Sequence, residues 1–150
     1  MKDKTIDYVL RHTWLAVTKM YNEQGTKFNS TMAIGFALLS IDPEKGTPST
    51  SLGPKMGMEA TSLSRIIKNM ETQGLIERKP NPEDGRGVLI HLTEIGKEKR
   101  NFSKERVLIF NEAVRKNISA EKIEHFYEVA EVINDLISNK KIYTNESILK

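Results

Sequence analysis

The sequence contains no cysteine in its 150 residues, and this absence removes several kinds of chemistry at once. It excludes disulfides, a cysteine zinc site, a thiolate nucleophile and a direct thiol redox sensor. The three histidines, His12, His91 and His125, lie far apart and lack the spacing of metal ligands. We therefore predict no metal site and no cofactor.

Long apolar runs are also missing. No stretch approaches the roughly 20 apolar residues that a membrane span requires, and charged residues make up 29% of the chain. The N-terminal MKDKTIDYVLRH lacks the apolar core of a signal peptide because Asp3, Lys4 and Asp7 interrupt it. These observations predict a cytoplasmic protein that has no membrane partner.

The sequence shows no group of residues typical of an active site. The serines and threonines of segment 59–73 have no partnering base, and the carboxylates are scattered along predicted helical surfaces. No apolar setting pairs them in a way that would tune their pKa values. We predict that the protein is not an enzyme.

What the sequence does have is a local excess of positive charge. The formal net charge is +3, and the whole surplus lies in residues 45–100, which hold ten basic and seven acidic residues. A surplus confined to the middle third indicates one face that attracts a polyanion.

The apolar spacing predicts a mainly helical chain with one small β-hairpin, an α+β fold. Helical periodicity marks residues 6–22, 31–39, 49–56, 59–73, 94–116 and 120–137. Residues 75–79 and 87–92 have strand character and are joined by a polar loop, 80–85, that ends in Asp-Gly. The order helix, turn, helix, hairpin is that of a winged helix-turn-helix.

The fourth predicted helix, residues 59–73, has the pattern of a helix that lies in the major groove of DNA. Its apolar stripe is centred between Ile66 and Ile67, so the opposite face carries hydroxyls, an amide and two cations. We predict that DNA contacts come from this face and from the start of the preceding helix: Ser49, Thr61, Ser62, Ser64, Arg65, Lys68 and Asn69. Arg65 is the candidate for a guanine edge and Lys68 for a phosphate. Any exposed amphipathic helix would show a similar polar face.

The hairpin adds a second candidate contact. Asp84-Gly85-Arg86 puts a cation at the predicted tip, where a guanidinium can enter the adjacent minor groove and Asp84 can brace it. In the alternative interpretation Asp-Gly is only a tight turn and Arg86 a solvated charge.

The run SLGPKMGMEATSLSRIIKNMETQGLIERKPNPEDGRGVLIHLTEIGKEKR resembles the core signature of the MarR (multiple antibiotic resistance regulator) family of bacterial transcription regulators. The matching features are the leucine-glycine of the helix-turn-helix, Gly74-Leu75 entering the wing, Asp84 with Arg86, and Leu92-Thr93 followed by Gly96. Many family members have arginine where this chain has Gly85.

The resemblance implies a winged helix-turn-helix lobe at residues 29–92 and dimerisation helices at 1–24 and 94–140, all within one domain, 1–150. It implies a homodimer that binds a palindromic operator in double-stranded DNA, usually as a repressor, with Arg86 in the minor groove and Asp84 positioning it. The alternative is a winged-helix module that binds another protein and not DNA.

Two further expectations concern the terminal helices. Their wide apolar stripes are separated in sequence by the winged unit, so we expect them to meet in a homodimer, although they could instead complete a monomer core. Aromatic residues there either pack in the core or line a pocket for a small aromatic effector, for which His12 and Trp14 are the candidate ligands.

Overall fold

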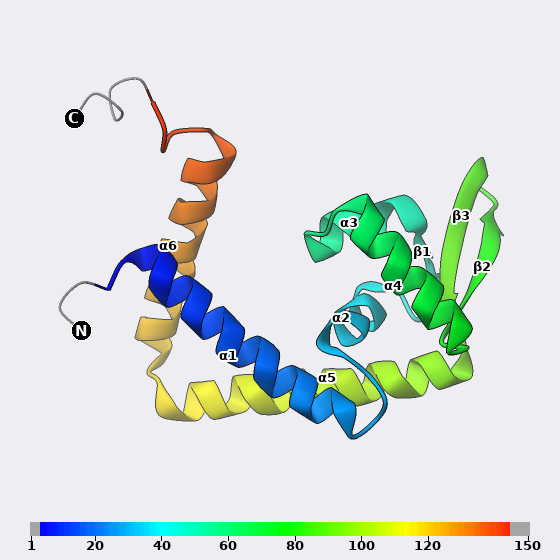
Figure 1. The fold of residues 1–150 in the computed structure, drawn as a ribbon, viewed down its shortest axis with the longest axis horizontal. Helices are drawn as coiled ribbons and strands as arrows, with labels where there is room; N and C mark the ends of the chain where they lie inside the picture. The colour runs from blue at the N-terminus through cyan, green and yellow to red at the C-terminus, as the bar shows by residue number, and fades with distance from the viewer. Residues whose placement is uncertain (1–3, 145–150) are drawn as a thin grey trace. The chain divides into compact units, whose positions relative to one another are not determined.

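The computed structural model describes residues 4–144, and it confirms a mainly helical chain with a small antiparallel wing (Figure 1). The elements in order are α1 (Ile6–Thr26), α2 (Met32–Ser40), β1 (Thr47–Pro48), α3 (Ser49–Met56), α4 (Ala60–Thr72), β2 (Ile76–Asn81), β3 (Asp84–Leu92), α5 (Glu94–Asn117) and α6 (Ala120–Ser138). Within residues 4–144, no helix combines the length and apolar character needed to cross a bilayer.

The chain divides into two compact units, and the division falls inside α5, between Val107 and Leu108. The first unit contains α1 to β3 and the beginning of α5, and the second contains the rest of α5 and α6. Both ends of the predicted domain 1–150, residues 1–3 and 145–150, lie outside the described residues.

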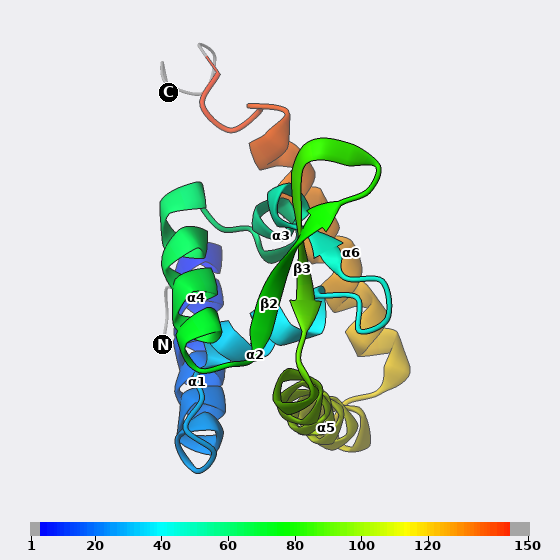
Figure 2. The same cartoon turned by 90° about the vertical axis from the view of Figure 1, so that its right-hand side faces the viewer.

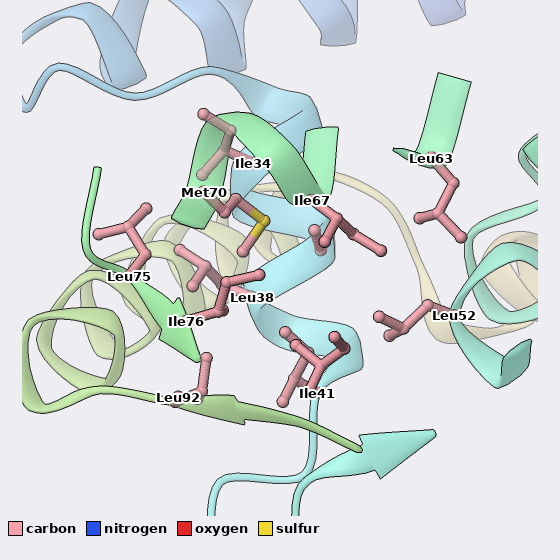
Figure 3. Close-up of a cluster of buried hydrophobic side chains, with 12 residues drawn as sticks. Ile34, Leu38, Ile41, Leu52, Leu63, Ile67, Met70, Leu75, Ile76 and Leu92 are labelled. Carbon is pink, nitrogen blue, oxygen red and sulfur yellow. The ribbon is translucent and has the colours of Figure 1, made fainter. Parts of the chain in front are cut away.

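The core of the first unit is built around α2. No charged residue occurs from Met32 to Ser40, and a helix that is apolar on all sides has to be covered by its neighbours. Apolar side chains from α3, α4 and the base of the hairpin surround it (Figure 3). The buried residues are Ile34, Ala37, Leu38, Ile41, Leu52, Leu63, Ile67, Met70, Leu75, Ile76, Ile90 and Leu92.

The turn between α3 and α4 forms as predicted. Gly57 ends α3 in the left-handed conformation, with φ of 61°, which glycine adopts without steric cost. α3 runs over the predicted residues although Pro54 lies inside it. Gly53 is buried, and a Cβ there would lie 3.3 Å from the Met58 carbonyl oxygen of the turn and 3.5 Å from the Leu63 side chain of α4, so the chain packs closely at this glycine.

At the corner between α1 and α2, the first helix extends beyond the predicted range 6–22. Gly25 lies buried in its last turn, where a Cβ would be 2.6 Å from the Ser30 carbonyl oxygen. The cap of α2 is Thr31, whose Oγ1 accepts a hydrogen bond from the Ile34 amide at 3.2 Å. Close packing, which sequence spacing does not reveal, explains this glycine.

The sheet has three strands in the order β1-β3-β2. The sequence did not predict β1, because a strand of two residues has no periodicity to detect. Thr47 pairs with Ile90, and its buried Oγ1 accepts a hydrogen bond from the Asp42 amide at 2.9 Å. Asp42 in turn accepts hydrogen bonds from the amides of Glu44 and Lys45, which lower the pKa of its carboxyl group.

The hairpin turn is shorter than the predicted loop 80–85 and does not lie at Asp84-Gly85. Asn81 pairs with Asp84, so Pro82 and Glu83 form the turn. The next pair is Pro80 with Val88, which leaves residues 85–87 as a bulge on β3. Gly85 does not have positive φ. The strands also run further toward the tip than predicted. The Glu83 amide donates a hydrogen bond to Asn81 Oδ1, and this bond stabilises a compact turn.

In the second unit, α6 begins at its cap Ser119, whose Oγ accepts a hydrogen bond from the Lys122 amide. Ile123 is buried, but most of the apolar residues of α6 are exposed. The exposed members are Phe126, Tyr127, Val129, Val132, Leu136 and Ile137.

Candidate nucleic-acid interface

The polar face of α4 is exposed along its whole length. Its apolar residues Leu63, Ile67 and Met70 are buried and Ile66 packs partly against them, so the helix is fixed with its other side outward. That exposed side carries all six residues predicted on it: Thr61, Ser62, Ser64, Arg65, Lys68 and Asn69.

The cations on this face are available to a ligand. Arg65 and Lys68 have no ion pair among the described residues, whereas Arg78, Lys79 and Lys97 pair with neighbouring carboxylates. An unpaired, exposed guanidinium keeps its planar set of donors for an incoming acceptor. Asn69 differs, because its Oδ1 accepts a hydrogen bond from Gln73 Nε2 at 2.8 Å and only its amide group stays outward.

At the wing, Asp84 and Arg86 lie together but not as an ion pair. Asp84 Oδ1 accepts a hydrogen bond from the backbone amide of Arg86 at 3.0 Å, so the carboxylate orders the chain and leaves the guanidinium exposed. Asp84 Oδ2 lies 3.2 Å from the Cβ position of Gly87, which shows that a side chain there would crowd the carboxylate. Bulges of this kind redirect a side chain away from the sheet.

The other predicted contact, Ser49, is half-buried at the first residue of α3. Lys55, which was not among the predicted contacts, is exposed in the last turn of the same helix. The sequence did contain an indication of this contact, since Lys55 belongs to the positive surplus of residues 45–100.

The connection from α4 to the wing is held by Thr93, which also caps α5. Thr93 Oγ1 donates to the Gly74 carbonyl at 2.6 Å and accepts from the Gly96 amide at 3.0 Å, while the Thr93 amide donates to the Leu75 carbonyl at 3.0 Å. Figures 1 and 2 show that α4 ends beside the base of the β2–β3 hairpin.

A second link joins α4 to the wing. Arg78 Nε and Nη2 donate to Glu71 Oε1 and Oε2 at 2.7 Å and 3.1 Å, and this contact raises the pKa of Arg78. Sequence spacing gave no indication of this pair, because the residues belong to different elements.

A small pocket of about 30 Å³ lies within the first unit. Its lining includes Phe36 of α2 and Phe102 and Arg106 of α5, together with Tyr21, whose pKa is raised by burial. The Arg106 guanidinium lies 4.8 Å from the centre of the Phe102 ring, and its Nη2 donates to Glu105 Oε2 at 3.1 Å. Its buried Nε atom has no hydrogen-bond partner among residues 4–144. An aromatic acid could supply both a ring and an acceptor here.

The predicted effector ligands do not line this pocket. Trp14 is exposed and its ring centre is 6.4 Å from that of Phe36, a residue of the pocket wall. His12 is exposed and stacks on Tyr8 at 5.2 Å. Arg106 was not among the predicted ligands, and its position one helical turn after Phe102 was the available signal.

Sequence comparison finds a match to the model of the MarR family over residues 31–88. The organic hydroperoxide resistance transcriptional regulator of Bacillus subtilis is 38% identical over 80 residues, which cover 53% of this chain and 54% of the relative. The HTH-type transcriptional regulator YdgJ of the same organism is 29% identical over 60% of this chain and 55% of its own length. The chain thus spans about half the length of these curated relatives.

The solved structures extend the likeness of fold over most of the chain. The MepR–DNA complex of S. aureus has a TM-score of 0.80 at 18% identity, covering 89% of this chain and 99% of that one. The PcaV transcriptional regulator of Streptomyces coelicolor, in complex with its natural ligand, has a TM-score of 0.75 at 18% identity and covers 88% and 93%. A mutant MarR of E. coli complexed with operator DNA has a TM-score of 0.75 at 22% identity, covering 85% of this chain and 92% of that one.

Proposed function

Because this chain belongs to the MarR family of winged helix-turn-helix transcription regulators, which are not enzymes, we propose that it binds double-stranded DNA as a homodimer. This proposal rests on the exposed face of α4, where Arg65 and Lys68 have no ion pair within the described part of the chain. The exposed Arg86 guanidinium of the wing supplies a second contact. In this proposal α4 enters the major groove and Arg86 the adjacent minor groove.

A homodimer has a particular consequence for the DNA. Two copies of α4 related by a twofold axis require an inverted repeat, with half-sites about 10 base pairs apart. A dimer bound over such an operator blocks other proteins from the same DNA, so we propose that it acts as a repressor.

The experiment is a selection from a pool of randomised duplexes about three helical turns long, followed by anisotropy titration of the duplex recovered. Wild type should recover an inverted repeat. Arg65→Ala should relax the preference at one position in each half-site, where a bidentate contact contributes about 1–3 kcal/mol. Arg86→Ala should weaken binding to all duplexes and reduce the salt slope by about 0.9 for each phosphate that is no longer neutralised.

Lys104→Ala is the matched control, because Lys104 is an exposed cation of α5 outside the proposed interface. The proposal fails if wild type recovers no common sequence, or if Arg65→Ala and Arg86→Ala bind as Lys104→Ala does. Binding to a protein partner without DNA affinity would support the interaction module instead.

We propose in addition that a small aromatic acid releases the DNA by entering the pocket at Arg106. The pocket has room for little more than water at 30 Å³, so a ligand has to widen it and will favour a different conformation of the protein. With no cysteine in the chain, the signal does not pass through a thiol. Benzoic acids should raise the melting temperature of wild type but not of Arg106→Ala, and an equal rise in both would contradict this site.

A further inference from the structure

We propose that the ion pair between Glu71 and Arg78 sets the position of the wing relative to α4, and so places Arg86 for its groove while α4 occupies its own. This inference rests on the proposed DNA-binding function and deepens it. Glu71 lies in the last turn of α4 and Arg78 on β2. The pair joins the two elements that carry the proposed DNA contacts.

The geometry is that of a specific, directional contact. Both carboxylate oxygens of Glu71 accept hydrogen bonds from Arg78, at 2.7 Å from Nε and 3.1 Å from Nη2. A two-point contact between planar groups fixes orientation as well as distance. An ion pair joined by only one hydrogen bond lacks this property, because the two groups can rotate about that bond.

The core holds the hairpin mainly at its base, and Val88 of β3 packs only partly against it. Among the residues of β2 and β3, only Ile76, Ile90 and Leu92 are buried. β2 is exposed from Glu77 to Pro80, so burial does not fix the part of this strand nearer the tip.

Arg78 is placed on the correct side of the strand to make the link. Alternation along β2 puts Arg78 on the same face as the buried Ile76, and its cross-strand partner is the buried Ile90. Arg78 therefore leaves the hairpin on the side of the core, where α4 lies (Figure 2).

The turn and the ion pair act together. Gly74, with φ of 70°, forms the turn, and Thr93 holds its carbonyl at 2.6 Å. The turn, the buried Ile90 and the pairing of β1 with β3 hold the base of the hairpin. The ion pair adds a direct link from β2 to α4. A wing ordered in advance does not lose conformational entropy when DNA binds.

The test uses the full chain and the duplex recovered by the selection above, with binding measured by anisotropy. Glu71→Gln should weaken DNA binding by about threefold to tenfold, the range expected when one restraint must be imposed on binding. Its melting temperature should change little, because the pair is partly exposed, with side-chain exposures of 34% and 48%. In the Arg86→Ala background the same substitution should have no further effect, because the wing then has no contact to position.

Glu77→Gln is the matched control. Glu77 pairs with Lys79 at 3.0 Å within the same strand. Glu77→Gln therefore removes the same charge as Glu71→Gln but breaks no link between two elements. The charge exchange Glu71→Arg with Arg78→Glu should restore much of the lost affinity, and it keeps the test informative if the single variant folds poorly.

The inference is overturned if Glu71→Gln binds as Glu77→Gln does, or if its loss of affinity persists in the Arg86→Ala background. It is also overturned if Glu71→Gln binds more tightly with a steeper salt slope, since Glu71 would then be masking the charge of Arg78. Failure of wild type to bind any duplex would instead refute the proposed function itself.

Discussion

At the scale of single residues, Gly96 is the glycine with the least room for a side chain. A Cβ on Gly96 would overlap the Leu75 carbonyl oxygen, the group that accepts the Thr93 amide at the base of the wing. We expect Gly96→Ala to lower the free energy of unfolding by about 2 kcal/mol or more, because backbone atoms must shift to relieve the clash. Urea unfolding at a fixed protein concentration measures this change.

Gly85 provides the comparison for that experiment. A Cβ there meets no atom within 4 Å, so Gly85→Ala should leave the urea midpoint nearly unchanged. Equal midpoints for the two variants would show that the start of α5 does not pack closely against Leu75.

The stability of the fold should depend on pH through Asp42. Hydrogen bonds from the Lys45 and Glu44 amides hold the pKa of Asp42 below its ordinary value. The stabilisation is therefore complete above the unfolded pKa of about 3.9, and it is lost as pH falls through the lower, folded pKa. Asp42→Asn keeps an acceptor without the charge.

The measurement is the difference in melting temperature between wild type and Asp42→Asn from neutral pH downward. Any advantage of wild type should hold to about pH 4 and shrink below it. A difference that grew with falling pH would contradict the sign of the pKa shift.

At the scale of elements, the wing has a position where a second cation can be added. Gly85 has no positive φ and an open Cβ direction, so arginine fits there without strain. We expect Gly85→Arg to raise affinity for all duplexes and to steepen the salt slope by about 0.9 for each additional phosphate that it neutralises. Anisotropy titrations at several salt concentrations give both quantities.

The control is Gly85→Ala, which changes the backbone preference without adding charge. If arginine and alanine at this position gave the same salt slope, the wing bulge would not face DNA.

At the scale of the whole molecule, apolar residues of the terminal helices are exposed in the single chain. They include Trp14 at 52% on α1 and Val129 at 55% on α6, and such patches mark interaction surfaces. We expect Val129→Glu to give particles with the mass of one chain in light scattering, whereas wild type should give particles with the mass of two chains. Its melting temperature should also lose the rise with protein concentration that assembly causes.

Glu128→Gln, one residue away and also exposed, should behave as wild type. A mass of two chains for Val129→Glu would place the dimer contact elsewhere.

The sequence by itself determined the order of the helices and the outward face of α4. Helical periodicity is a local property, so Leu63, Ile67 and Met70 identified the buried side and thereby the exposed Arg65 and Lys68. The turn between α3 and α4 could also be predicted from the sequence, since Gly57 follows the last helical residue.

Only the tertiary structure decided the features that join separate elements. β1, the packing of Gly25 on Ser30, the pocket at Arg106 and the Glu71–Arg78 pair all depend on residues brought together by folding. The wing turn belongs to the same group, because pairing of Asn81 with Asp84 shortens the predicted loop 80–85 to a turn at Pro82-Glu83. Strand register is set by contacts across the sheet, and these are absent from the local sequence pattern.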